Sequence, residues 1–350
     1  MQMYNKKSLK EILAESSLGH LAGNGEIRKL EERLCKLYDT KYALVVDSAT
    51  NAILYLFLAL GIKRAEIITT PLTYGGTLSG PLILGCKFHF ARIDSHSLTI
   101  DSLSILTLIK NNPRVKAVVA TEFCGNTFDY KSISQICREK GILFIVDSAQ
   151  NLGYNYYNES ITNYADVVIL SLGDGKTLCV GSGGAILTNC DSFYKKLIAT
   201  CQHPHRQEVD VGIGKSSEFS LNGRMNPILA AMANLLFEEA FLQLNKKKKN
   251  LSDVKNCLLH FKSVEEVLSQ DDGTFYYFPV RIKNIDEFEE EFNNSSLCRY
   301  LYWRTANFVP RPKQLCRVGK KRSVLTYDKE QIDDVLKNLI LIHTKGSIYD

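Results

Sequence analysis

The chain has 350 residues, of which 45% are hydrophobic and 23% are charged. These values are close to those of folded globular proteins and exclude global disorder. Its 43 Lys and Arg residues against 38 Asp and Glu residues give a net charge of +5, and this weak, dispersed excess does not indicate nucleic-acid binding. A chain of this length is long enough for two domains.

Ten cysteines occur at irregular spacings without a Cys-x-x-Cys pair, and the seven histidines do not fall at metal-ligand spacing beside them. We therefore expect reduced cysteines and no metal site. The N-terminus lacks the apolar stretch of a signal peptide, and no uninterrupted apolar run reaches the roughly 18 residues of a membrane span. The sequence thus predicts a cytoplasmic protein without a membrane partner.

Short runs rich in Val and Ile alternate with helical stretches between residues 42 and 188. One such stretch, residues 129–142, has apolar side chains at helical spacing and a C-cap candidate in Gly141. Apolar strands separated by helices are typical of a mostly parallel sheet that is covered on both faces. We therefore predict an α/β domain with strands at residues 43–48, 65–70, 87–93, 116–123, 142–147, 166–172 and 184–188.

The pattern changes after Pro227, where a long apolar helix is predicted over residues 228–244 and runs into the lysine block at 246–249. A smaller α+β region follows, with a strand at 275–282 and a closing helix at 328–342. We place the domain boundary near Asn245. The predicted domains are therefore residues 1–245 and 246–350.

Polar clusters follow several of the predicted strands, and ligands of parallel sheets bind where strands end and helices begin. The first cluster, residues 47–52, follows a strand and opens a helix. Its backbone N–H groups and hydroxyls would face a phosphate at the positive end of that helix. Alternatively, Ser48 or Thr50 is an ordinary N-cap.

The second cluster places Asp147 at the end of a predicted strand, with Gln150 three residues later. The carboxylate of Asp147 could pair with a cationic ring nitrogen, and Gln150 could reach a neighbouring ring oxygen. Asp is also a common capping residue after a strand, so this cluster alone leaves both interpretations open.

The third cluster, residues 171–184, begins with Ser171 and carries Lys176 in a glycine-flanked turn. It lacks the spacing of a nucleotide-binding P-loop. A lysine that loses solvation in such a turn is a candidate Schiff-base former, whereas a lysine in an ordinary loop is solvated.

Two further segments are candidates for binding. In residues 219–227, Asn222 and Arg224 are either polar anchors or turn residues beside a glycine. Residues 203–219 form a long polar stretch with His203, His205 and Arg206, which could bind an acidic or phosphorylated group. The alternative for this second segment is a mobile surface loop.

Taken in order, these clusters resemble the DegT/StrS family of sugar aminotransferases, which are enzymes of fold type I that depend on pyridoxal 5′-phosphate (PLP). The resemblance covers nearly the whole chain and is strongest between Asp47 and Ala231. In the family, the residue at Lys176 is joined to PLP and the residue at Asp147 holds its pyridine nitrogen. The other matching residues are Ala49, Thr50 and Ser171 at the phosphate, Tyr74 on the ring, Gln150 near the phenolic oxygen and Asn222 at the phosphate of the neighbouring subunit.

The chain also departs from the family pattern. Ser182 stands where the family has a glutamate in Gly-Glu-Gly-Gly, and Ala49 stands where the phosphate loop has a glycine. The segment that includes Tyr302 and Trp303 does not match the usual substrate-side pattern of His and Pro. These departures affect the expected identity of the amino acceptor more than the expected binding of PLP.

The resemblance implies a homodimer with shared active sites that moves an amino group from glutamate or glutamine to a keto sugar, often nucleotide-linked, or to a cyclitol ketone. Lys176 and Asp147 would be the catalytic residues. A sugar dehydratase or a lyase is the alternative within PLP chemistry, although family dehydratases replace the lysine by histidine. A non-catalytic regulatory protein with this fold is the alternative from another class.

Overall fold

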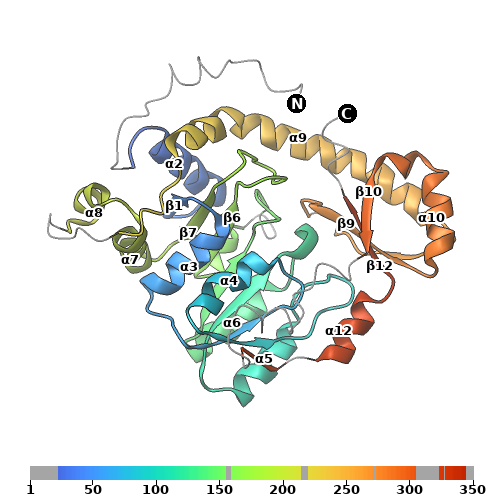
Figure 1. Cartoon of the computed structure of the whole chain (residues 1–350), viewed down its shortest axis with the longest axis horizontal. Coiled ribbons are helices and arrows are strands. Elements are labelled where there is room, and N and C mark those ends of the chain that lie inside the picture. Colours follow the sequence, from blue (N-terminus) through green and yellow to red (C-terminus); the bar gives the residue numbers. More distant parts are fainter. Residues whose placement is uncertain are drawn as a thin grey trace.

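The structure is a computed structural model that describes residues 23–154, 159–213, 220–270, 273–304, 323–326 and 328–343. Its largest element is an eight-stranded sheet in the order β1-β7-β6-β5-β4-β2-β3-β11 (Figure 1). Strand β7 runs antiparallel to both of its neighbours, and the other paired strands are parallel. The strands are β1 (Tyr42–Val46), β2 (Glu66–Thr69), β3 (Lys87–Phe90), β4 (Val115–Thr121), β5 (Leu143–Asp147), β6 (Val167–Ser171), β7 (Gly184–Thr188) and β11 (Val324–Thr326).

All seven predicted strands are present, each within a few residues of its predicted bounds, and the mostly parallel α/β sheet is confirmed. The sequence analysis missed β11, a short edge strand that comes from far along the chain and pairs with β3. Its three residues carry too little pattern to be recognised without the neighbouring strand.

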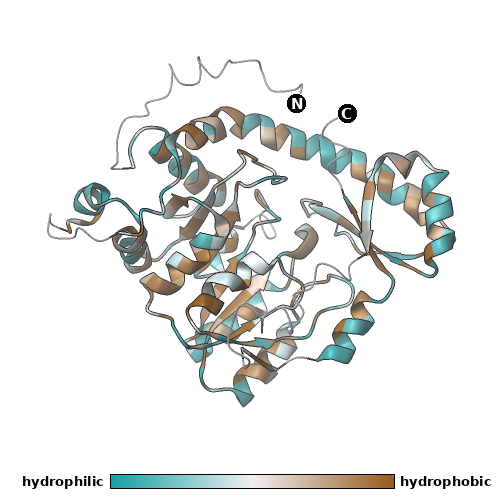
Figure 2. Ribbon diagram, in the orientation of Figure 1, coloured by the Kyte–Doolittle hydropathy of each residue, from teal (hydrophilic) through white to brown (hydrophobic). Residues whose placement is uncertain are grey.

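Helices cover both faces of this sheet, because its strands are apolar on both sides. One face packs against α2, α5, α6 and α9, and the other against α3, α4 and α7. Apolar residues concentrate between these layers (Figure 2). The helices are α2 (Glu26–Tyr38), α3 (Ala49–Ala59), α4 (Gly75–Ile83), α5 (Ser102–Asn111), α6 (Tyr130–Lys140), α7 (Asp191–Cys201), α8 (Pro204–Val211) and α9 (Pro227–Leu259).

Helix α6 ends as predicted. Gly141 is its C-cap residue in the left-handed conformation, with φ of 62°, which a glycine adopts without a steric penalty. The turn returns the chain directly to β5, which ends at Asp147. The cap therefore helps to set where the strand delivers this carboxylate.

The C-terminal part contains a second sheet of four antiparallel strands in the order β10-β12-β9-β8 with a core of its own. The predicted closing helix over residues 328–342 is wrong in its second half. The helix stops at Leu336, Asn338 takes a left-handed φ of 57°, and Leu339–His343 forms β12 between β9 and β10. The elements are β8 (Val264–Val267), β9 (Tyr277–Ile282), α10 (Ile285–Asn293), β10 (Leu301–Arg304), α12 (Lys329–Leu336) and β12 (Leu339–His343).

Helix α9 links the two sheets and is longer than predicted. It continues without a break from Pro227 past Asn245 to Leu259, and Figure 1 shows it running from the α2 side of the molecule to the C-terminal sheet. By length and composition it could cross a membrane. Its buried residues contribute to the cores on both sides, and core helices commonly meet the same criterion. The domain boundary near Asn245 remains a prediction.

Candidate active site

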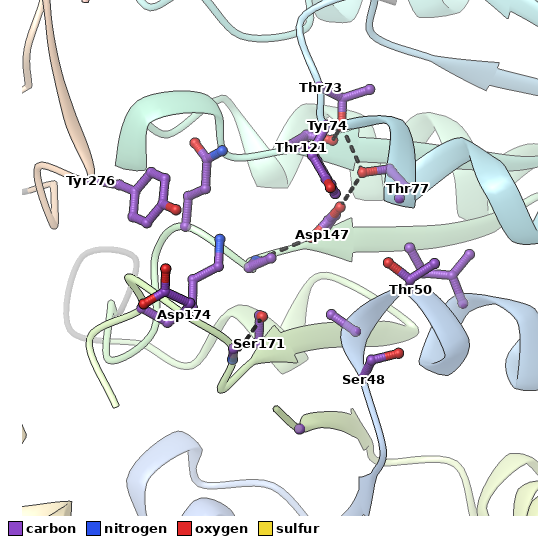
Figure 3. A pocket seen from close by; sticks show the side chains of 18 of the residues that line it. Ser48, Thr50, Thr73, Tyr74, Thr77, Thr121, Asp147, Ser171, Asp174 and Tyr276 are labelled. Atoms are coloured by element: carbon purple, nitrogen blue, oxygen red, sulfur yellow. Dashed lines mark hydrogen bonds between the residues drawn. The ribbon is translucent and has the colours of Figure 1, made fainter. Parts of the chain in front are cut away.

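A cavity of about 450 Å³ lies where β4, β5 and β6 end and where α3 and α4 begin (Figure 3). Strand register brings its residues together, because Thr121 lies opposite Asp147, and Ser171 lies opposite Gly184. The carboxyl ends of parallel strands lie at the same edge of a sheet, and ligands bind at this edge. The predicted site residues that line this cavity are Ala49, Thr50, Tyr74, Asp147, Gln150, Ser171 and Lys176.

Asp147 is the last residue of β5 and is buried. Its Oδ2 accepts a hydrogen bond from Thr77 Oγ1 at 2.6 Å, and its Oδ1 accepts one from the backbone N–H of Ala149 at 3.1 Å. Burial raises the pKa of Asp147, whereas the bond from Thr77, the bond from Ala149 and the charge of Lys176 act in the opposite direction. The site thus holds a carboxylate whose orientation is fixed and whose charge depends on its partners.

Thr77 belongs to a short chain of hydroxyl groups. Its Oγ1 lies 2.7 Å from Thr73 Oγ1, which lies 2.9 Å from Thr121 Oγ1. All three threonines are buried and line the cavity. This chain ties the start of α4 to the ends of β4 and β5, and it holds Asp147 from the side opposite to Ala149.

The start of α3 borders one end of the cavity. Ser48 is the N-cap, and its side chain accepts a hydrogen bond from the backbone N–H of Asn51, so the ordinary capping role proposed for Ser48 is confirmed. Helical N–H groups of the first turn have no partner within the helix. After capping, those of Ala49 and Thr50 remain at the positive end of α3, beside the cavity.

Two glycines let the walls of the cavity approach the start of α3. A Cβ atom at Gly76 would lie 2.5 Å from Thr50 Oγ1, and one at Gly184 would lie 2.5 Å from the backbone nitrogen of Ala49. A side chain at position 184 would displace the backbone at the start of α3, and one at position 76 would force the Thr50 hydroxyl to move. This end of the cavity is therefore closely packed.

Lys176 and Ser171 enter the cavity from β6 and the turn that follows it. Ser171 is buried, and its Oγ accepts a hydrogen bond from the backbone N–H of Gly173 at 3.4 Å. Lys176 is half-buried, and its Nζ lies 4.2 Å from the centroid of the Tyr276 ring. The lysine is therefore neither a solvated loop residue nor a fully buried one.

Gln150 and Tyr74 complete the cavity wall. The Oε1 atom of Gln150 accepts a hydrogen bond from the backbone N–H of Cys124 at 2.7 Å. Tyr74 precedes α4 and is 75% exposed in the single chain. The exposed ring could therefore cover a bound molecule.

Asn222 is exposed and lies outside the described lining of this cavity. Its φ of 51° is left-handed, and its backbone N–H donates to Ser220 Oγ at 2.9 Å. Ser182, which replaces the family's glutamate, lines the cavity and donates a hydrogen bond to the backbone oxygen of Asp47 at 2.8 Å.

The interpretation of Arg206 as a substrate ligand is wrong. Residues 204–211 form α8, with His203 as its N-cap, and Arg206 points into the protein with no exposed surface. Its guanidinium donates to both carboxylate oxygens of Glu31, at 2.7 and 3.0 Å, and to Asp210 at 3.0 Å. A buried cation requires such partners. Residues 214–219 of the same predicted loop lie outside the described residues.

The sequence analysis missed several residues of the cavity. Thr73, Thr77 and Thr121 gave no signal, because isolated threonines near strand ends are common. Tyr276 was expected in a strand but not at this site. It lies immediately before β9 and lines the cavity. Contacts between segments 100 residues apart cannot be read from local patterns.

These residues fit PLP. The cavity offers helix N–H groups and the Ser171 hydroxyl for a phosphate, a buried carboxylate for a ring nitrogen, and a lysine amine for the aldehyde. The glycine at position 76 keeps open the space beside Thr50 that a side chain would fill. These groups match the phosphate, the ring nitrogen and the aldehyde of the cofactor.

Comparison with known proteins decides the family. The model of the DegT/DnrJ/EryC1/StrS aminotransferase family matches residues 3–330. The chain belongs to this family. Membership confirms the resemblance seen in the sequence.

Among curated proteins, the UDP-4-amino-4,6-dideoxy-N-acetyl-beta-L-altrosamine transaminase of Helicobacter pylori is 29% identical over 248 residues, which are 70% of this chain and 64% of that protein. The enzyme of the same name from Campylobacter jejuni strain 81-176 is 31% identical over 177 residues, which are 51% of this chain and 47% of that protein. The matches thus span about half to two thirds of these family members.

Among solved structures, Helicobacter pylori PseC, an aminotransferase involved in the biosynthesis of pseudoaminic acid, superposes with a TM-score of 0.80 at 23% identity, covering 99% of this chain and 92% of that one. The Escherichia coli GDP-4-keto-6-deoxy-D-mannose-3-dehydratase with bound hydrated PLP gives a TM-score of 0.79 at 18% identity, covering 96% and 90%. The shared architecture confirms the predicted fold type I.

Proposed function

We propose that this chain is a PLP-dependent aminotransferase that moves an amino group from an amino acid, glutamate or glutamine, to a keto sugar. The acceptor is nucleotide-linked in this proposal, with a cyclitol ketone as the other candidate. The convergence of Lys176, Asp147 and the start of α3 on one cavity carries the proposal. The names of the related transaminases support it.

PLP, when bound, would supply an electron sink for the bond that breaks at the donor's α-carbon. The N–H groups of Ala49 and Thr50, with the Ser171 hydroxyl, would hold its phosphate. The carboxylate of Asp147 would keep the ring nitrogen protonated, because a buried anion stabilises a neighbouring cation. The amide of Gln150 faces the same cavity and would bind the ring oxygen.

Lys176 would be the general base and acid. Its amine would move a proton from the donor's α-carbon to the C4′ carbon of the cofactor, and in the second half-reaction from C4′ to the carbon of the keto acceptor. The two half-reactions would follow one another at the same cavity, which gives ping-pong kinetics. Lys176 is half-buried and lines the cavity, so its amine lies inside the site where the donor would bind.

The dehydratase among the structural neighbours shows that this fold also supports another reaction. Lys176 favours amino transfer, since family dehydratases have histidine at that position. A non-catalytic regulatory role would not require a lysine and a buried carboxylate in one cavity. Neither alternative predicts net transfer of an amino group to a keto-sugar acceptor.

We also propose a homodimer in which each active site uses both chains. Asn222 is exposed outside its own cavity, and the adjacent Leu221 is 53% exposed. A partner that covers Leu221 would bring Asn222 to the phosphate end of the neighbouring site. We further propose a cytoplasmic location, on the irregular cysteine spacing described above.

A spectroscopic half-reaction tests the function. Purified protein incubated with PLP should be yellow, should lose its visible absorbance on addition of glutamate or glutamine, and should regain it with a keto-sugar acceptor. Lys176→Ala should show no such cycle, whereas the exposed Lys196→Ala on α7 should behave as wild type. Wild-type protein that binds PLP but never exchanges amino groups would refute the proposal.

A further inference from the structure

Residues 273–277 of the C-terminal part lie directly against the wall of the cavity. Thr274 Oγ1 donates a hydrogen bond to the backbone oxygen of Gln150 at 2.6 Å. The backbone N–H of Tyr276 donates to the backbone oxygen of Cys124 at 3.0 Å. Two bonds thus join this segment to the loops that follow β5 and β4.

The packing at this contact is close. A Cβ atom at Gly125 would lie 2.7 Å from Thr274 Oγ1, and one at Gly273 would lie 2.6 Å from the backbone oxygen of Gly125. Cys124 and Phe275 both have left-handed backbones, with φ of 62° and 52°. Such conformations are unfavourable at non-glycine residues and persist where the surroundings enforce them. The surrounding structure therefore fixes the backbone conformation at this contact.

The contact continues to two groups of the active site. The N–H of Cys124, whose carbonyl is held by Tyr276, donates to Gln150 Oε1 at 2.7 Å. This bond fixes the side-chain amide of Gln150 with its oxygen toward Cys124, so its NH₂ group is the end available as a donor to the cavity. The ring of Tyr276 lies beneath Lys176 Nζ at 4.2 Å.

We propose that Tyr276 and Thr274 are positioning residues of the active site. The Tyr276 ring holds the ammonium group of Lys176 whenever its amine is not covalently engaged, and Thr274 fixes the turn that carries Gln150. A cation over an aromatic ring is attracted by the negative face of the ring, which favours this lysine rotamer. The proposal deepens the function assigned above and rests on it, because both residues act through groups that serve PLP.

The role of Tyr276 is tested by comparing Tyr276→Phe, which keeps the ring, with Tyr276→Leu, which removes it. In protein without PLP, the amine reagent trinitrobenzenesulfonate should modify Lys176 about tenfold faster in Tyr276→Leu than in wild type, as followed by peptide mass spectrometry. With PLP, the same variant should show a kcat lowered about tenfold at an unchanged KM for the donor. Tyr276→Phe should stay within about twofold of wild type in both measurements.

Tyr302→Leu is the matched control, since Tyr302 lies on β10 of the same sheet and bonds to Glu289 outside the cavity. It should lower thermal stability without changing either measurement. Equal labelling of Lys176 in Tyr276→Leu and wild type would overturn the proposal. So would a Tyr276→Phe variant that behaves like Tyr276→Leu, because the hydroxyl would then be the active part.

The role of Thr274 is tested with Thr274→Val, which keeps the shape but leaves the Gln150 carbonyl without this donor. PLP should bind roughly 5- to 10-fold more weakly, the effect of one lost hydrogen bond, and Thr274→Ser should restore binding. Thr200→Val on α7, which loses a hydroxyl bond on the surface, should bind PLP as wild type does. Unchanged binding in Thr274→Val, or a serine that fails to restore it, would overturn this role.

Different results would refute the proposed function and the role of Tyr276. If wild-type protein bound no PLP, the proposed function would fail. The labelling of Lys176 would still report whether the ring of Tyr276 holds its ammonium group, because that measurement is made without PLP.

Discussion

Thr77 Oγ1 donates a hydrogen bond to Asp147 Oδ2 over 2.6 Å, joining the first turns of α4 to the end of β5 (Figure 3). The bond opposes the effect of burial, which raises the pKa of Asp147. Thr77 is itself held by Thr73 at 2.7 Å. Thr77, which carries no charge and gave no signal in the sequence, therefore orients Asp147 and favours its ionised form.

Replacing Thr77 by valine should impair catalysis without removing a group that touches substrate. Loss of a bond to the charged form raises the pKa of Asp147 further, so activity should disappear earlier as the pH falls. Hydrogen bonds to charged groups contribute about 1.5–3 kcal/mol, which predicts a kcat lowered roughly 10- to 100-fold. A pH profile of kcat measures both effects, with Thr77→Ser as control, and an unchanged acid limb would contradict them.

Glu122 predicts a second pH effect, on stability. Burial raises its pKa from 4.5 to about 7, whereas the neighbouring side chains of Ser148, Tyr130 and Asn151 act in the opposite direction. The folded state therefore holds a proton that the unfolded state releases, and this stabilisation is complete below pH 4.5 and is lost as the pH rises through 7. Glu122→Gln should reduce the loss of unfolding free energy between pH 4.5 and 8 by on the order of 3 kcal/mol.

Urea titrations of the protein without PLP at the two pH values measure this difference. Glutamine keeps the shape and can accept the hydrogen bond that Tyr130 donates to Glu122. A variant with the same pH dependence as wild type would show that Glu122 is not the group that titrates.

Arg206 predicts a stability effect that is independent of the cofactor. Removing one partner of a buried ion pair leaves the other charge uncompensated, at about 3–5 kcal/mol. Arg206→Met should therefore lower the unfolding free energy by this amount, whereas Arg206→Met combined with Glu31→Met should recover most of it. Denaturation midpoints of the two variants test this, and a single variant as stable as wild type would show that the pair is not closed in solution.

The sequence predicted the large sheet well because each strand is a local run of apolar residues followed by a recognisable turn or helix start. The same locality explains why Asp147, Ser171 and Lys176 could be placed at strand ends. The helix predicted over residues 339–343 was wrong because local pattern does not decide the structure of this segment. Their pattern suits a helix or a strand, and pairing with β9 and β10 decides for the strand.

The remaining parts of the site depend on contacts between distant segments. Tyr276 and Lys176 are in contact although they are 100 residues apart in the sequence. The local sequence around either residue does not predict this contact. Arg206 was predicted to bind substrate because its sequence neighbours are polar. In the structure it is buried and donates a hydrogen bond to Glu31, which is 175 residues away in the sequence. Such pairs become visible only when the fold is known.

Mixing two inactive variants tests the shared active site. Lys176→Ala and Asn222→Asp chains should each be weakly active alone. In a mixed dimer with shared sites, one site carries both lesions and the other carries neither, so activity should return to about a quarter of wild type on the basis of random pairing. A mixture that exchanges subunits and stays inactive would place both residues in the site of one chain.

Lys176 should be the lysine that bonds to PLP. Lys247 is the informative competitor, because burial on α9 lowers its pKa to about 7 and leaves much of its amine unprotonated. Incubation with PLP, reduction with borohydride and peptide mass spectrometry locate the bond directly. The account predicts a label on Lys176 that is lost in Lys176→Ala and kept in Lys247→Ala. A label on Lys247, or one spread over surface lysines, would contradict it.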